Sequence, residues 1–295
     1  MSRMDSPIDE APRSCRPFLK WPGGKRWIAP LLDDIIREDL DGTYYEPFAG
    51  AAAVFLSLQP SRAVLSDVNR DLIRCLSTVR QHPEAVVRGL RRLSNTSDCY
   101  YRVRRSQPRT SVGEAVRFVY LNRTCWGGLY RLNRNGDFNV PFGDSGRPIC
   151  RRGDIVAAAS ALESATLRHA EFGDVLPDAG RGDVVYADPP YTTRGQDNGF
   201  VRYNEVLFKW DDQERLAREA KRAATRGALV VVSGLWHPDL LRLYQGWWAL
   251  RISRSSRVSR SPAGRRLVRE AVLFSRLPSY YAGGGEQELC RLDLA

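Results

Sequence analysis

Tyr186-Ala187-Asp188-Pro189-Pro190-Tyr191 follows a short apolar run in the second half of the chain. The run, residues 183–186, is rich in β-branched and aromatic side chains and comes after the turn signal Gly182. Such a run predicts a strand that is buried on both faces, as in a parallel sheet. Asp188 is therefore expected at the carboxyl end of a central strand, where open α/β sheets bind their ligands.

Asp188-Pro189-Pro190-Tyr191 offers two hydrogen-bond acceptors and an aromatic face to a ligand. The prolines remove two backbone donors and fix φ, so the carbonyl of Pro189 is not consumed by a helix. The Asp188 carboxylate and this carbonyl suit the two hydrogens of an exocyclic amine on a planar heterocycle, which would stack on Tyr191. The four residues alone leave a second interpretation open, a turn in which Asp188 caps a helix.

Residues 44–55 have the order strand, glycine turn and helix, with Gly50 in the turn. This order brings a ligand to the N-terminus of a helix, as in dinucleotide-binding folds. A second buried strand, predicted over residues 63–69, carries Asp67 near its end. An acid about 20 residues beyond a glycine loop accepts the ribose hydroxyls of a bound nucleoside. A role for Asp67 as the cap of the next helix is the open alternative.

Residues 18–25 contain two of the four lysines in the chain, Lys20 and Lys25. The glycine pair in this segment lets the backbone pass close to a ligand, Trp21 offers a stacking face, and Lys25 offers a cation to a carboxylate. The segment also suits the start of a helix predicted over residues 27–39, whose apolar side chains fall on one face.

Residues 70–151 break the alternation of strands and helices. Helical patterns cover residues 70–80, 84–93 and 114–125, and polar, arginine-rich linkers such as residues 102–105 separate them. The segment is predicted to be an inserted helical domain that faces DNA phosphates. A charge run of this kind is more often only a solvated face, so that interpretation stays open.

Asn135-Gly136 lies between two β-compatible runs and predicts a hairpin. Arg131 on such a hairpin fits the major groove of DNA, because arginine can bond guanine O6 and N7 together. The open alternative is an ordinary hairpin whose Leu129 and Phe138 belong to the core.

Composition limits the class of protein. The 295 residues are 43% hydrophobic, carry a net charge of +11 and have a pI of about 9.6, which favours a polyanionic partner. No apolar run has membrane length and the N-terminus is not a signal peptide, so a soluble, cytoplasmic protein is expected. The six cysteines form no Cys-x-x-Cys pair and the three histidines are far apart, which argues against a disulfide scaffold or a zinc site.

These motifs resemble the Dam-type DNA adenine-N6 methyltransferase family, an alpha group of amino-methyltransferases. The resemblance rests on Asp188-Pro189-Pro190-Tyr191, on residues 18–25, on Glu46-Pro47-Phe48 and on the hairpin residues 138–143. It implies an α/β fold, a Rossmann-like class I methyltransferase sheet with an inserted, mainly helical target-recognition domain that carries the β-hairpin. One departure is Ala52, where family members usually have a second glycine; alanine would be strained there if φ is positive and favourable if the position is helical.

The resemblance also implies roles for individual residues. The implied catalytic residues are Asp188, Pro189, Pro190 and Tyr191. The residues implied to bind S-adenosyl-L-methionine are Trp21, Lys25, Glu46, Phe48, Gly50, Asp67, Phe172, Asp174 and Asp188. The residues implied to bind double-stranded DNA are Lys20, Trp126, Leu129, Arg131, Asn139 and Pro141, and no metal and no membrane partner are expected.

The implied reaction is methyl transfer to N6 of an adenine flipped out of the duplex, at GATC or a site containing GAT, because Leu129, Arg131 and Pro141 all match. Three alternatives are open: a cytosine-N4 methyltransferase, which more usually has serine in place of Asp188; an enzyme that methylates protein glutamine; and a catalytically inactive DNA-binding factor. The sequence fixes neither an association with a restriction nuclease nor the oligomeric state, and it is compatible with a monomer.

The domain prediction follows from these assignments. Residues 1–15 are expected to be a flexible arm, residues 16–69 and 152–277 a discontinuous cofactor-binding catalytic domain, residues 70–151 the DNA target-recognition domain, and residues 278–295 a flexible tail.

Overall fold

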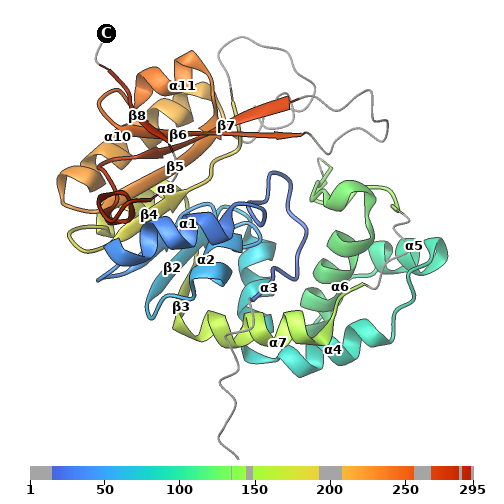
Figure 1. Cartoon of the computed structure of the whole chain (residues 1–295). Helices are drawn as coiled ribbons and strands as arrows, with labels where there is room; N and C mark the ends of the chain where they lie inside the picture. Colours follow the sequence, from blue (N-terminus) through green and yellow to red (C-terminus); the bar gives the residue numbers. More distant parts are fainter. Residues whose placement is uncertain are drawn as a thin grey trace, which may run out of the picture.

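The computed structural model describes residues 15–133, 135–143, 149–192, 208–255, 267–285 and 288–293. Its centre is an eight-stranded sheet with the order β3-β2-β1-β4-β5-β7-β6-β8 (Figure 1). The strands are β1 (Tyr44–Glu46), β2 (Ala63–Asp67), β3 (Ala165–His169), β4 (Val184–Ala187), β5 (Leu229–Leu235), β6 (Trp248–Ser255), β7 (Leu267–Phe274) and β8 (Leu289–Arg291). The first five are parallel, and β7, β6 and β8 are joined by antiparallel pairs. This arrangement confirms the predicted α/β, Rossmann-like fold.

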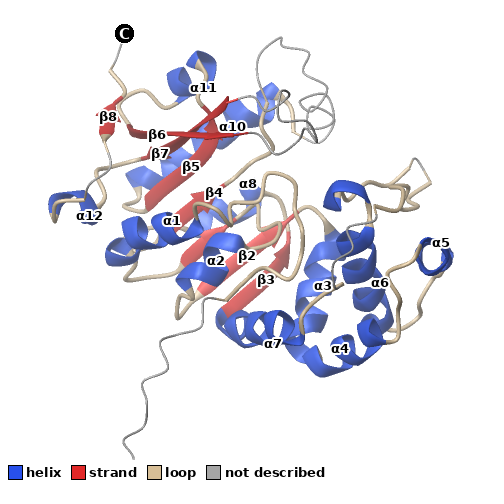
Figure 2. Cartoon of the chain, turned by 45° about the vertical axis from the view of Figure 1, so that its right-hand side comes forward, coloured by secondary structure: helices blue, strands red, loops and turns tan. Residues whose placement is uncertain are grey.

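Both faces of the sheet are covered by helices (Figure 2). The helices over one face are α1 (Ala29–Ile36), α2 (Ala53–Leu58), α3 (Arg70–Gln81), α7 (Arg152–Ala161) and α12 (Ser279–Ala282). Those over the other face are α8 (Phe172–Val175), α10 (Trp210–Thr225) and α11 (Pro238–Leu243). Burial on both faces explains why β4 and the first four residues of β5 are continuous apolar runs.

Side chains of β4 alternate between the two cores. Val184 and Tyr186 belong to one hydrophobic cluster, and Val185 and Ala187 belong to the other. This alternation is the period of two that a strand imposes. Because both faces of β4 are packed up to Ala187, the backbone directly before Asp188 is held in place.

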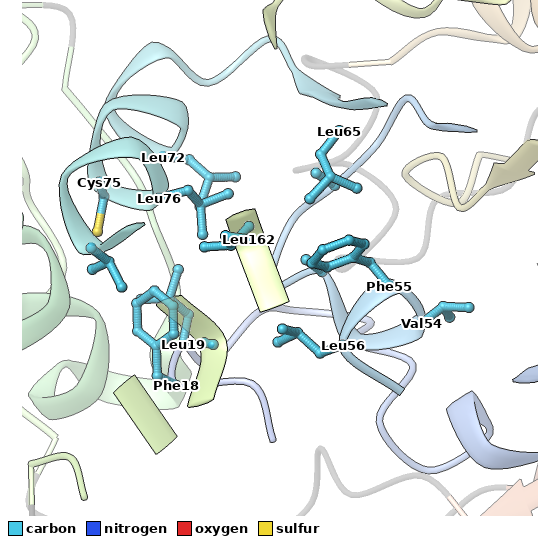
Figure 3. Packing of buried hydrophobic residues seen from close by; sticks show 14 of the residues in the cluster. Phe18, Leu19, Val54, Phe55, Leu56, Leu65, Leu72, Cys75, Leu76 and Leu162 are labelled. Atoms are coloured by element: carbon cyan, nitrogen blue, oxygen red, sulfur yellow. The ribbon is translucent and has the colours of Figure 1, made fainter. Parts of the chain in front are cut away.

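The helical insertion shares its core with the sheet. It contains α3, α4 (Pro83–Arg91), α5 (Ser97–Arg105) and α6 (Ser111–Thr124), beyond the β3 edge (Figure 1). Val86 and Phe118 of these helices belong to the same cluster as Leu65 of β2. Close by, Phe18 and Leu19 of the amino-terminal segment pack with side chains of α2, β2 and α3 (Figure 3). The amino-terminal motif is therefore held against both the sheet and the insertion.

Two predictions about local structure are wrong. Residues 102–105, predicted to be a linker, form the last turn of α5. Thr96 caps this helix by accepting the N–H of Cys99, and its basic residues gather in the last turn, where they complement the helix dipole. The arginine run therefore belongs to a capped helix.

The second error concerns the flexible tail predicted for residues 278–295, of which the structure describes residues 278–285 and 288–293. Asp39 accepts the backbone N–H of Ser279 at 2.9 Å and holds the start of α12. Further on, β8 pairs with β6, and Leu289 and Leu292 pack against opposite cores. The glycine run at residues 283–285 led to the prediction of a flexible tail, although α12 and β8 on either side of it are held by these contacts. Of the arm predicted over residues 1–15, residues 1–14 lie outside the described ranges.

None of the helices in the described ranges is long and apolar enough to cross a bilayer. All six cysteines, which lie within those ranges, are free thiols.

Candidate active site

Asp188 follows β4 at the point where the direction of strand addition reverses. From β1 the chain adds β2 and β3 on one side of the sheet, whereas β4 and β5 lie on the other side. In an open α/β sheet such a switch point forms the ligand crevice. The residues that follow β1 and β4 are therefore brought together at one edge.

Lys25 forms an ion pair with Asp188. Its ammonium lies 2.7 Å from Oδ1 and 2.9 Å from Oδ2 of the carboxylate, and it also donates to the carbonyl of Gly23 at 2.9 Å. The Lys25 side chain is 5% exposed and that of Asp188 is 19% exposed. Asp188 thus sits at the rim of the sheet, not within the core. The implied contact of Lys25 with a cofactor carboxylate stays a prediction, because here the ammonium is engaged by Asp188.

Glu270 completes this charged group, and the sequence analysis missed it. Its Oε2 accepts the Tyr191 hydroxyl at 2.8 Å and lies 3.8 Å from the Lys25 ammonium, which is itself 4.8 Å from the centre of the Tyr191 ring. Burial, followed by the carboxylates of Asp188 and Glu270, raises the pKa of Tyr191 well above its ordinary value. The hydroxyl therefore remains a donor. The available signal was an acid immediately before the apolar run of residues 271–274.

Gly50 brings the two predicted cofactor motifs together. Its φ of +47° is left-handed, and a side chain there would approach the Trp21 ring to 2.7 Å. The Gly50 N–H donates to Asp67 Oδ2 at 3.0 Å, and Asp67 Oδ1 accepts the N–H of Asn69 at 2.9 Å. Trp21, Gly50 and Asp67 therefore form one contiguous surface after β1 and β2, in a conformation that only glycine adopts without strain.

Ala52 is left-handed as well, with φ +51° and ψ +42°, so the strained alternative applies. Replacing Ala52 by glycine relieves about 1–2 kcal/mol of strain but loses a buried methyl and adds unfolded-state entropy, each about 0.5–1 kcal/mol. We expect the free energy of unfolding to change by less than about 1 kcal/mol. Ala53→Gly, in α2, should instead destabilise by about 1 kcal/mol or more. Equal losses for both variants in urea unfolding would contradict this account.

Glu46 lies beneath the loop and is 3% exposed. Its Oε2 accepts the Tyr44 hydroxyl at 2.9 Å and the Phe55 N–H at 3.2 Å, which ties β1 to α2. Burial raises the pKa of Glu46 to about 8, and these two hydrogen bonds partly oppose the shift. Its place in this buried network gives it a role in supporting the loop; the implied cofactor contact stays a prediction.

Stability should depend on pH through Glu46. Because its folded pKa of about 8 exceeds the ordinary value of 4.5, its contribution is full below about pH 4.5 and is lost as the pH rises through 8. Glu46→Gln should therefore flatten the fall in unfolding free energy between pH 5 and pH 8, measured in urea. The exposed control Glu163→Gln should keep the wild-type slope. Parallel curves for wild type and Glu46→Gln would contradict the buried, protonated carboxyl.

An aromatic cluster flanks the loop on the other side. Phe48 stacks on Phe172 with centroids 5.6 Å apart, and Phe208 meets both rings edge-on. Arg215 lies over Phe172 at 4.3 Å. Asp174, in the short helix α8, is exposed. The structure thus brings Phe48 and Phe172 together, and their implied contact with the cofactor stays a prediction.

The hairpin presents several of the predicted DNA-contacting side chains to solvent. It is closed by an antiparallel bridge between Leu132 and Phe138, beside Gly136 with φ +82°. Arg131 is exposed, and its Nε donates to Asn139 Oδ1 at 2.7 Å. Among the residues predicted to contact DNA, Trp126, Arg131 and Pro141 are exposed, and the Trp126 residue is 54% exposed. Leu129, Asn139 and Lys20 are half-buried. Arg134 and residues 144–148 lie outside the described ranges.

Contacts from α6 and from the hairpin attach the helical insertion to the segments predicted to bind the cofactor. Lys20 donates from Nζ to the carbonyl of Arg123 at 2.8 Å, and its backbone pairs twice with the buried side chain of Asn122. Tyr130 stacks on Trp21 at 6.4 Å and donates to Asp71 in the first turn of α3. The hairpin and the Gly50 loop are therefore joined through the side chains of Tyr130 and Trp21.

A family model matches residues 21–249, and its family is described as the D12 class N6 adenine-specific DNA methyltransferases. The match spans the strand ends, the loop and the hairpin described above. The chain belongs to this D12 family. Membership confirms the resemblance drawn from the motifs and identifies the chain as an adenine-specific DNA methyltransferase by family.

Individual relatives agree with the D12 assignment. The chain is 34% identical to a DNA adenine methylase of Serratia marcescens over 270 residues, covering 88% of this chain and 98% of that one. It is 36% identical to the DNA adenine methylase of Escherichia coli strain K12, over 74% of this chain and 80% of that one. It is 31% identical to a type II methyltransferase, M1.LlaDCHI, of Lactococcus lactis subsp. cremoris, over 78% of this chain and 84% of that one.

Within the described residues, no group of three or more histidine, cysteine or acidic side chains is arranged to hold a metal ion.

Proposed function

We propose that this D12-family protein transfers a methyl group from S-adenosyl-L-methionine to N6 of adenine in double-stranded DNA. The observation that supports this most is the position of Asp188 and Pro189 after β4, at the same edge of the sheet as the Gly50 loop. A base held by Asp188 and Pro189 would therefore lie next to a cofactor held by the Gly50 loop.

The residues around Gly50 have the chemistry that this cofactor requires. Each oxygen of Asp67 accepts one backbone N–H, which leaves lone pairs for two ribose hydroxyls. When bound, the cofactor supplies an electrophilic methyl group on a positively charged sulfur. The residues proposed to hold it are Trp21, Lys25, Glu46, Phe48, Gly50, Asp67, Phe172, Asp174 and Asp188.

The amine of adenine is a poor nucleophile, because its lone pair is delocalised into the ring. Asp188 and the Pro189 carbonyl accept its two hydrogens, which favours a pyramidal nitrogen with a localised lone pair. They also lie where positive charge develops on nitrogen during transfer, so they stabilise the transition state more than the ground state. Asp188 need not be a strong base, since the proton is lost after the methyl group has moved.

The target base must leave the stack to reach Asp188. Tyr191 offers a replacement stacking face, and the exposed Trp126 ring is suited to fill the gap in the duplex. Leu129, Arg131 and Pro141 on the hairpin support recognition of GATC or a site containing GAT.

The proposed chemistry and target can be tested together in cells. The chain is expressed in bacteria that lack adenine methylation, and the modified bases in their DNA are mapped by single-molecule sequencing. We expect N6-methyladenine at one short motif that contains GAT, and none when Asp188→Ala is expressed. Methylation at cytosine N4, or unmodified DNA from cells that contain the folded protein, would contradict the proposal.

A further inference from the structure

We propose that Glu270 is a positioning residue for methyl transfer, acting through Lys25 and Tyr191. This inference rests on the proposed function and deepens it. Glu270 offers the Lys25 ammonium a second counter-ion, so the negative charge of Asp188 is available to the target amine. Through the Tyr191 hydroxyl, it also fixes the plane of the ring on which the base stacks.

The position of Glu270 in the sheet is unusual for an acid. It lies within β7, opposite Leu235 of β5 and Ile252 of β6, and it is 2% exposed. The next four residues of the strand, 271–274, are apolar and buried. A buried carboxylate costs stability unless it is well partnered, and an apolar side chain of similar volume generally serves folding as well. Because folding does not require a carboxylate at this position, the role of Glu270 is expected to lie with the groups that it contacts.

Those groups belong to the proposed active site. The Tyr191 hydroxyl donates to Glu270 at 2.8 Å, and the Lys25 ammonium lies 3.8 Å away. The same ammonium is 2.7 Å from Asp188. Glu270 thus joins the first and last residues of the predicted catalytic motif through contacts from a different strand.

The balance of charge explains what Glu270 contributes. Asp188 and Glu270 are two carboxylates within salt-bridge distance of one ammonium, so Lys25 divides its attraction between them. Without Glu270, the ammonium would be drawn to Asp188 alone and would neutralise more of the field that Asp188 offers to a nitrogen that becomes positive. Glu270 reduces this neutralisation, and such fixed charges act strongly in a water-poor site.

The test compares Glu270→Gln with wild type in single-turnover methylation of a GATC duplex, with enzyme and S-adenosyl-L-methionine saturating. We expect the rate constant to fall at least about 10-fold, with the dissociation constants for the duplex and for S-adenosylhomocysteine within about threefold of wild type. A rate constant within twofold of wild type, or a loss explained by weaker binding, overturns the inference.

A double-mutant cycle separates this role from a structural one. If Glu270 acts by balancing Lys25, then Glu270→Gln in a Lys25→Met background should reduce the rate further by less than about threefold. An undiminished 10-fold loss in that background contradicts the mechanism.

Tyr191→Phe keeps the buried acid and removes only its hydrogen bond, so it serves if Glu270→Gln does not fold. It should lower the rate constant at least about threefold, with the duplex dissociation constant unchanged. Tyr186→Phe is the matched control, because the Tyr186 hydroxyl bonds Ser233 at 2.8 Å. A wild-type rate for Tyr191→Phe contradicts the positioning of the ring. Absence of adenine methylation by wild type would instead overturn the proposed function, and this inference with it.

Discussion

Asp188→Ala should lower the rate of adenine methylation by at least about 1,000-fold, while the dissociation constant for duplex DNA stays within about threefold of wild type. The substitution removes one of the two acceptors proposed to hold the amine and the charge nearest to it. Lys25 keeps Glu270 within 3.8 Å and the Gly23 carbonyl at 2.9 Å, so the buried ammonium remains partnered and the fold should persist. The rate is measured in single turnover and the affinity by fluorescence anisotropy.

Asp188→Asn is the informative companion to this variant. It preserves the shape and one acceptor oxygen but removes the charge, so we expect a large loss that is somewhat smaller than that of alanine. A variant with the activity of wild type would contradict the electrostatic role of Asp188. Loss of DNA binding equal to the loss of rate would show that the carboxylate supports the binding surface instead.

Arg131→Ala should cost about 1–3 kcal/mol of discrimination at one base pair of the target, a relaxation of specificity of roughly 5- to 150-fold. Arg131 is exposed on the hairpin, and Asn139 accepts from its Nε at 2.7 Å, which restricts the guanidinium to one orientation. The measurement is kcat/KM on GATC duplexes and on duplexes with each single substitution. The largest relaxation should fall at the guanine.

Arg242→Ala serves as the control for lost positive charge. Arg242 belongs to α11, on the part of the molecule away from the hairpin, and pairs with Asp239 at 2.8 Å (Figure 1). It should leave specificity unchanged. Equal loss of activity on every duplex by Arg131→Ala would indicate a phosphate contact rather than a base contact.

The sequence predicted the strand ends well, because a buried parallel strand leaves a continuous apolar run and its end marks the ligand edge. Asp188, Gly50 and Asp67 could be placed this way, and the structure brings them to one edge. The family of the chain could also be predicted, since four separate motifs agreed and the family match confirms it.

Partners that are far apart in the sequence could not be predicted. The Lys25–Asp188 pair joins residues 163 apart, and Glu270 meets Tyr191 across 79 residues. No local period encodes such pairs, because they follow from the order in which strands add to the sheet. The tail was misjudged for the same reason: β8 is short and weakly patterned, and only the free edge of β6 gives it a partner.

The identity of the methylated base tests the central claim most directly. Purified protein is incubated with S-adenosyl-L-methionine carrying a tritiated methyl group and with unmethylated duplex DNA, and the DNA is digested to nucleosides and separated. The account predicts that the label elutes with N6-methyldeoxyadenosine and that Asp188→Ala yields none. Label on a cytosine nucleoside, or unlabelled DNA with the wild-type protein, would contradict it.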